Sequence, residues 1–114
     1  MTKNQITYQP VQAITIKAKE DLPAFRFVSH LGSLCSENVK SLGVTETNWL
    51  KDEIASVVTL GTIGIEMTTG INAGENITSA TNGLGIKAGE NSEINGRALE
   101  SISGPGFIKM LLVP

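Results

Sequence analysis

The chain has 114 residues, of which 40% are hydrophobic and 18% are charged, with a formal net charge of −2. This length predicts one domain with a core of its own. Nine Lys and Arg against eleven Asp and Glu give no basic surface for nucleic acid. We expect neither a membrane span nor a signal peptide, because no run approaches the ~20 apolar residues that a span needs. The single cysteine excludes an internal disulfide.

The first segment of the chain differs from the rest. Residues 1–12 are polar, contain Pro10 and lack helical periodicity. We interpret them as an extended N-terminal arm that becomes ordered against a partner. Residues 13–114 then form the β domain.

Alternating residues predict the first strand of that domain. Ile14, Ile16 and Ala18 alternate with polar residues, which is typical of a strand with one buried face. The strongest strand signal is the β-branched segment 54–67, in which Gly61 and Gly64 mark a bulge or bend. Further strands are expected at 24–30, 31–35, 42–45, 77–78, 84–86, 97–101 and 106–113. Residues 46–53 form either a loop or a single helical turn.

Glycine-rich turns separate these strands. The sequence Ala-Gly-Glu-Asn occurs at 73–76 and again at 88–91, and each copy predicts a turn whose glycine has positive φ. Asn82-Gly83 and Asn95-Gly96 are typical of hairpin turns. About seven to nine short strands at this spacing predict an all-β, single-domain fold, either a small sandwich or a barrel.

No group of residues predicts an enzyme. His30 could activate Cys35 as a nucleophile, but nothing else supports the pair, and a structural histidine and a buried cysteine are favoured. Asp52 and Glu53 would need more oxygen ligands to hold a hard cation. Gly83-Leu84-Gly85 begins a dinucleotide motif, but Ala88 stands where its third glycine belongs. We therefore predict no catalytic, cofactor-binding or metal site.

Contact residues are predicted in two places. Trp49 and Leu50 lie in a charged loop, where the tryptophan is either a core anchor or a binding residue. Tyr8 lies in the polar arm, which favours contact with a partner. The arm can also add a strand to a neighbour's sheet through main-chain hydrogen bonds. The full predicted contact set is Thr2, Lys3, Gln5, Ile6, Tyr8, Trp49 and Leu50.

Several segments, in their order and spacing, resemble the phage capsid cement, or head decoration, proteins. They are residues 13–18, 27–32, 42–45, 53–61, 71–78 and 95–100, and the resemblance extends over residues 13–113. It implies a small all-β protein on the outer face of an expanded tailed-phage head. Such a protein bridges subunits of the major capsid protein and catalyses nothing.

The resemblance also implies where the chain acts and with what. It places the chain on the virion after synthesis in the host bacterial cytoplasm. It implies a homo-oligomer, with a homotrimer favoured at local three-fold positions and a homodimer open at two-fold positions. An alternative is a β-clip-type module that binds a carbohydrate or a cell-surface polymer. Only five aromatic residues count against that alternative.

Overall fold

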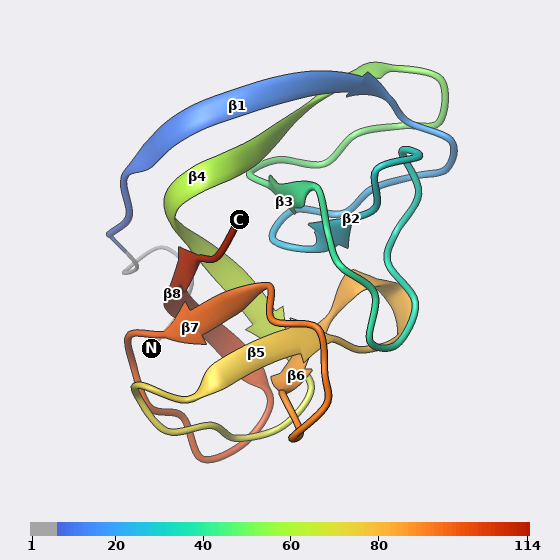
Figure 1. The fold of residues 1–114 in the computed structure, drawn as a ribbon. Helices are drawn as coiled ribbons and strands as arrows, with labels where there is room; N and C mark the ends of the chain where they lie inside the picture. The colour runs from blue at the N-terminus through green and yellow to red at the C-terminus, as the bar shows by residue number, and fades with distance from the viewer. Residues whose placement is uncertain (1–6) are drawn as a thin grey trace.

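The computed structural model describes residues 7–114, and within them the chain forms eight strands and one short 3₁₀ helix (Figure 1). The prediction of a small all-β domain with short strands is confirmed. Among these residues no helix is long and apolar enough to cross a membrane. The elements are β1 (Pro10–Lys17), β2 (Phe27–Val28), β3 (Gly43–Thr45), β4 (Ile54–Met67), β5 (Asn76–Ser79), η2 (Thr81–Gly83), β6 (Gly85–Lys87), β7 (Gly96–Ala98) and β8 (Gly106–Leu112).

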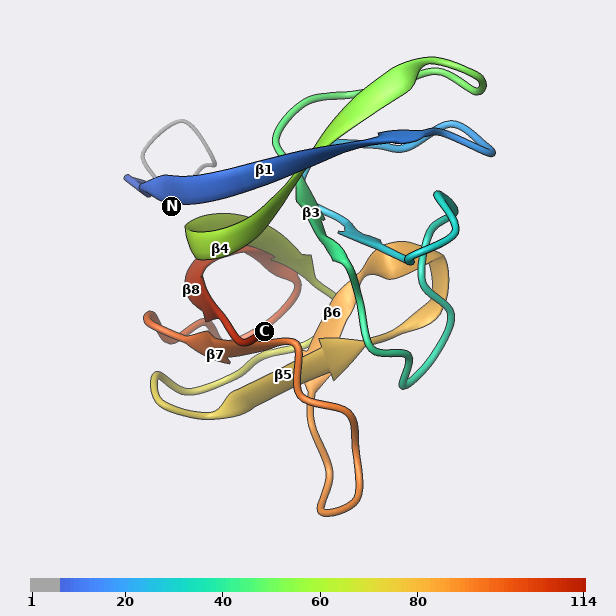
Figure 2. The same cartoon turned by 45° about the horizontal axis from the view of Figure 1, so that its top comes forward.

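The long strand β4 organises the whole fold. Its second half closes a five-stranded barrel in the order β4-β6-β5-β7-β8, and β8 pairs back to β4. Its first half lies in a separate sheet of order β2-β3-β4-β1. Figure 2 shows the result: β4 lies between β1 and the barrel strands β5, β7 and β8. One continuous strand therefore joins two sheets.

Gly61 lies where β4 passes from one sheet to the other. Its φ is +106°, which only glycine adopts without strain. A Cβ there would lie 2.6 Å from the Gln9 carbonyl oxygen. The β1–β4 register also shifts on both sides of Gln12, which pairs with the neighbouring Leu60, while Pro10 pairs with Gly61. The predicted bulge at Gly61 is confirmed, whereas Gly64 instead makes room for the ring of Phe25.

Two hydrophobic cores follow from this arrangement. The larger core fills the barrel and extends to the base of the second sheet. A smaller core lies under the first half of β4, where Val57 and Ala55 pack against Val28, Leu22 and Ala18. The largest buried side chains of the barrel core are Phe27, Ile63, Ile65, Met67, Ile77, Ile108 and Met110.

The predicted turn at Asn95-Gly96 is wrong. Asn95 is fully buried, and Gly96 is the first residue of β7. A Cβ on Gly96 would lie 2.5 Å from Met110 Sδ, so the glycine here admits a core side chain. A dipeptide that is typical of a tight turn is therefore a place where the β7 backbone lies close to the Met110 side chain inside the barrel.

Other expectations needed smaller corrections. The strand expected at 24–30 shortens to β2 because Phe25 has a φ of +60°, which breaks the extended backbone. Residues 31–35 form only an isolated bridge between Val28 and Leu34. Gly74 has the predicted positive φ, but Gly89 does not. The strand expected at 97–101 ends at Ala98, and residues 46–53 form a loop without a helical turn.

Candidate interaction surface

Strand β1 is the most exposed element of the fold. Every residue from Pro10 to Lys17 is exposed except Ile16, which is half-buried. The prediction of one buried face is therefore wrong at Ile14, whose side chain is 43% exposed. The reason is position: β1 is the edge strand of its sheet, and the small core reaches only its last residues. The strand also begins at Pro10, inside the segment that we assigned to the arm.

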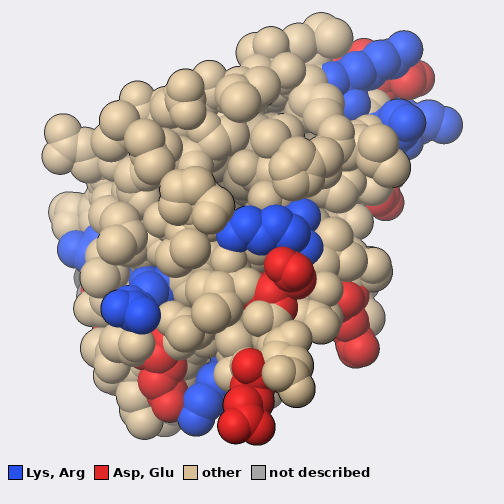
Figure 3. Space-filling view, in the orientation of Figure 1, with Lys and Arg blue, Asp and Glu red and all other residues tan. Residues whose placement is uncertain are grey.

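Most of strand β1 carries no charged side chain. Residues 10–16 include no Lys, Arg, Asp or Glu. Figure 3 shows a continuous uncharged area over β1 and the adjacent part of β4, with charged side chains at the far end of β1 and lower on the molecule. Exposed Val11, Ile14 and Leu60 contribute to this area. Neutral, partly apolar surface of this kind is typical of an interface.

A hollow of about 270 Å³ lies beside β1. Ile14 and Gln12 line it from β1, Leu60 and Thr59 from β4, and Leu42 and His30 from the segments around β2 and β3. Its rim includes Lys40, whose ammonium group donates to the carbonyls of Ile94 and Val113. Because Lys40 is held in this way, its charge is directed at the protein's own backbone. None of the other lining residues is Lys, Arg, Asp or Glu.

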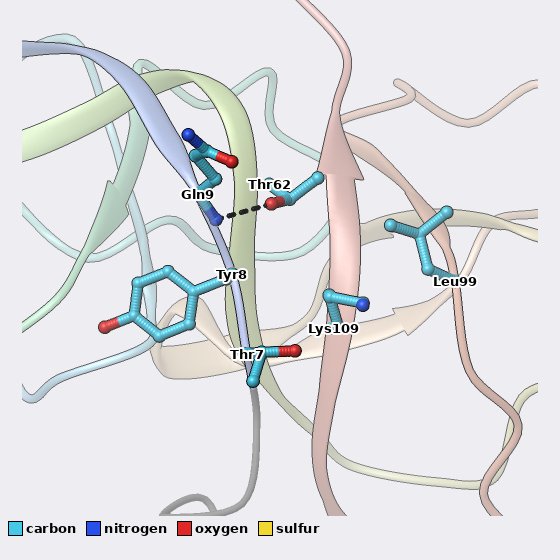
Figure 4. A pocket seen from close by; sticks show the side chains of 6 residues that line it. All are labelled: Thr7, Tyr8, Gln9, Thr62, Leu99 and Lys109. Carbon is cyan, nitrogen blue, oxygen red and sulfur yellow. Dashed lines mark hydrogen bonds between the residues drawn. The ribbon is translucent and has the colours of Figure 1, made fainter.

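A second hollow, of about 260 Å³, lies at the start of β1 (Figure 4). Thr7, Tyr8 and Gln9 line it from the segment before β1, Thr62 from β4 and Lys109 from β8. The Gln9 backbone N–H donates to Thr62 Oγ1 over 2.7 Å, and Thr62 N–H donates back to Gln9 O over 3.1 Å. These bonds attach the segment to the barrel.

Tyr8 packs against the body of the protein. Its ring meets Phe25 edge-on, with ring centroids 5.9 Å apart, and Phe25 meets Phe107 in the same way. Burial raises the pKa of the Tyr8 phenol, and the nearby Glu46 carboxylate, which accepts a hydrogen bond from it, raises the pKa further. The half-buried ring thus has a packing role within the chain, and its predicted contact with a partner stays a prediction.

The second predicted contact lies at the other end of β1. Trp49 is half-buried against the small core, and its backbone pairs with Leu22 through two 2.8 Å hydrogen bonds. Its indole Nε1 is buried without a hydrogen-bond partner. Leu50 beside it is 63% exposed. The structure therefore gives Trp49 the packing role and leaves Leu50 accessible.

The structure does not bring the predicted contact residues together. Tyr8 precedes β1, and Leu50 precedes β4, whose first residue, Ile54, pairs with Lys17 at the far end of β1. Eight strand residues at ~3.3 Å each separate the two places by roughly 26 Å. The predicted contacts Thr2, Lys3, Gln5 and Ile6 lie outside the described residues. Sequence reasoning predicted a strand here but did not place β1 among the contact surfaces, although its charge-free run from Pro10 to Ile16 was the available signal.

The two residues considered for catalysis, Cys35 and His30, lie in different environments. Cys35 is buried in the barrel core, and burial raises the pKa of its thiol to about 11. A thiol in this state is a poor nucleophile. His30 is exposed and lines the hollow beside β1. This geometry favours the interpretation of Cys35 as a small core residue.

The acidic pair is also engaged locally. Asp52 lies 4.0 Å from Lys17 Nζ, and Glu53 Oε1 accepts a hydrogen bond from the Leu50 N–H over 2.6 Å. Among residues 7–114, no group of three or more His, Cys, Asp or Glu is placed to hold a metal ion. The two carboxylates thus order the loop before β4.

The aromatic rings do not form a sugar-binding platform. All five lie within the described residues, and each is buried or half-buried. Carbohydrate modules stack sugars on exposed rings, so this burial gives no support to the alternative of a carbohydrate-binding module.

The fold and surface define a small β-barrel protein with a sheet that extends from one long barrel strand. No protein-family model and no curated protein matches the chain. Among solved structures, it is similar to the N base of the head fiber gp8.5 of bacteriophage phi29. The TM-score is 0.74, the sequence identity is 20%, and the match covers 90% of this chain and 93% of that chain. At this identity the likeness establishes the fold.

Proposed function

We propose that this chain is a structural protein of a tailed-phage head, which binds the outer surface of the expanded capsid and bridges subunits of the major capsid protein. The observation that carries the proposal is the fold likeness to a phage head fiber base over nine-tenths of the chain. The order of segments that resembles the head decoration proteins is a second line of support. Both lines support a role at the phage head.

The physical role of such a protein is to bind one state of the shell. A ligand that binds the expanded capsid and not free coat subunits stabilises the assembled state by mass action. At a hundredfold excess over the dissociation constant this amounts to about 2.7 kcal/mol per site. Because the binding site is repeated over the capsid surface, a modest affinity at each site is sufficient to stabilise the expanded capsid. A rigid barrel with contacts at its margins suits this task because little ordering free energy is lost on binding.

The separation of the predicted contact residues supports the bridging role. The segment around Tyr8 and the loop around Leu50 lie at opposite ends of β1. Two contacts roughly 26 Å apart, as the length of an eight-residue strand gives, can reach neighbouring subunits instead of one. We propose that residues 1–8 contact one coat subunit and that the loop with exposed Leu50 contacts another, while Trp49 packs beneath that loop.

Co-sedimentation with expanded heads that lack this protein tests the proposal. The purified chain is expected to pellet with expanded heads, to remain in solution with unexpanded heads, and to raise the temperature at which the heads lose their DNA. Failure to bind expanded heads would overturn the proposal.

Single variants test the two contacts. Leu50→Asp is expected to weaken head binding about tenfold or more, because a charge replaces an exposed apolar contact. Leu31→Asp is the matched control, since Leu31 is 70% exposed on a different turn. Removal of residues 1–6 should weaken binding and leave the thermal unfolding of the free protein unchanged. Equal affinity of all these proteins for heads would refute the assigned contacts.

A further inference from the structure

We infer that two copies of this chain pair edge to edge through their β1 strands, antiparallel and about a two-fold axis at Ile14. The result is a continuous sheet in which β1 of each copy lies between its own β4 and β1 of the other copy. The inference concerns the free protein and does not depend on the proposed function. It selects the homodimer from the two oligomeric states that the sequence left open.

The first observation is an unpaired strand edge. Within residues 7–114, β1 pairs with β4 alone. At the end of the ladder, Ala18 N–H donates to Glu53 O over 2.8 Å, and Ala18 O accepts from Asp52 N–H over 2.7 Å. Because backbone groups of alternate residues point to the same side, those of Ile16 and Ile14 also face β4. The N–H and C=O groups of Ala13 and Thr15 therefore face away from the sheet.

The length of this edge is limited at both ends. Pro10 has no N–H to donate, so a ladder cannot extend past it. At the other end the backbone of Gly32 covers Lys17: a Cβ on Gly32 would lie 2.3 Å from the Lys17 carbonyl oxygen. The edge that can accept a new strand thus lies between these limits, and its regular part is Ala13 to Ile16, past the register shift at Gln12. Figure 1 shows this strand along the outside of the molecule.

A register centred on Ile14 pairs this edge with a copy of itself. A register centred on Ala13 would need Val11, which lies beyond the register shift at Gln12 and whose backbone N lies toward Gly61. With Ile14 on the two-fold axis, Ala13 lies opposite Thr15 of the second copy, and Thr15 lies opposite its Ala13. The backbone N–H and C=O groups of Ala13 and Thr15 face away from β4 in both copies. The two residue pairs can therefore exchange about four main-chain hydrogen bonds. A shift by one residue would place inward-facing groups opposite outward-facing ones. A register centred on Thr15 would need the Lys17 carbonyl, which Gly32 covers.

The side chains fit the same register. Ile14, 43% exposed in the single chain, would meet Ile14 of the second copy across the axis. Apolar cross-strand pairs of this kind stabilise sheets. Lys17 would lie opposite Val11, which keeps the two lysines roughly 20 Å apart, six residues along the strand. No like charges face each other, because residues 10–16 carry none.

The absence of protective charge at the centre of the edge is the reason to choose a second copy as the occupant. Natural edge strands usually block pairing with inward lysines, prolines or bulges. In β1 these features stand only near the two ends, as Pro10 and the register shift around Gln12 at the start and Lys17 as the last residue. The remaining stretch, Ala13 to Ile16, is neutral and extended, and an identical strand supplies the matching donors, acceptors and apolar side chains.

The test is the mass of the full chain in solution, measured by light scattering or sedimentation equilibrium. We expect a mass twice that of the 12.1 kDa chain. Ile14→Lys and Ile14→Glu should each raise the dimer dissociation constant about tenfold or more, since like charges then face each other on the axis. An equimolar mixture of the two variants should form the heterodimer, because opposite charges now meet.

Two further variants make the result specific. Leu111→Lys is the matched control, because Leu111 is also 43% exposed on a strand but lies on β8, and it should remain dimeric. Thr15→Pro removes an N–H that faces away from β4, so it breaks no hydrogen bond to β4 and should give a folded monomer. This variant replaces the Ile14 variants if a charge at Ile14 prevents folding. A monomeric or trimeric wild-type chain would overturn the inference. A stable dimer of Ile14→Lys, or a failure of the mixture to associate, would do so too.

Discussion

Asn95 offers the sharpest test of how the fold holds the interaction surface in place. The residue is fully buried between the barrel and the segment that leads to β3. Its side-chain amide donates to Val39 O over 2.8 Å, and its Oδ1 accepts from Ser41 N–H over 3.0 Å. The side chain thereby fixes residues 39–41, which lead to the hollow beside β1.

The cost of Asn95→Ala can be estimated from these contacts. Val39 O loses its amide donor, although Ser79 Oγ, whose one proton also serves Ser36 O at 2.7 Å, lies 3.2 Å away. The Ser41 N–H loses its partner in a buried site. One orphaned buried donor costs about 1–3 kcal/mol. In a domain of this size each kcal/mol lowers Tm by roughly 4 °C. We therefore expect a loss of about 2 kcal/mol and a fall in Tm of about 8 °C.

Urea unfolding followed by the fluorescence of Trp49, the only tryptophan, measures this loss. Asn76→Ala is the control, because the Asn76 amide accepts only an exposed 3.3 Å bond from Arg97. It should change stability by less than about 0.5 kcal/mol. Equal effects of the two substitutions, or a loss at Asn95 below that value, would refute the assignment of a buried hydrogen-bonding role to Asn95.

Three further predictions follow from the described side chains. Tyr8 is the only tyrosine, so ultraviolet titration should show its pKa above 10.0, and Glu46→Gln should lower it without abolishing the shift, because burial is the largest cause. The stability that protonated Tyr8 contributes should be complete below pH 10.0 and lost as the pH rises through the folded value; equal pKa values in the folded and unfolded chain would contradict this. Cys35 should react with a thiol reagent far more slowly in the folded than in the unfolded protein, because the thiol is buried with a pKa of about 11; similar rates would show that it is accessible. Gly96→Ala should cost about 1–3 kcal/mol by overpacking against Met110, whereas Gly104→Ala, with nothing within 4 Å of the new Cβ, should be nearly neutral.

Local patterns in the sequence were sufficient for much of the fold. The β-branched run 54–67 forms a single strand, and the bend at Gly61 lies where the glycine predicted it. Period-2 alternation and glycine spacing act between near neighbours, so they can be interpreted without the rest of the chain. Where a residue's role depends on a distant partner, the same signals failed. Asn95-Gly96 has the pattern of a turn but supplies a buried amide and a space for Met110.

The same distinction between local patterns and distant partners applies to the candidate contact residues. Sequence composition alone excluded a disulfide framework and a basic nucleic-acid surface, and it predicted an all-β domain, because these properties depend on counts and local order of residues. Only the tertiary structure decided that Ile14 is exposed, that Tyr8 packs against Phe25 and that β1 has an open edge. A strand's alternation is the same at the centre and at the edge of a sheet, and what differs is which strands lie beside it. That neighbourhood is set by contacts between residues far apart in the chain, which no local pattern records.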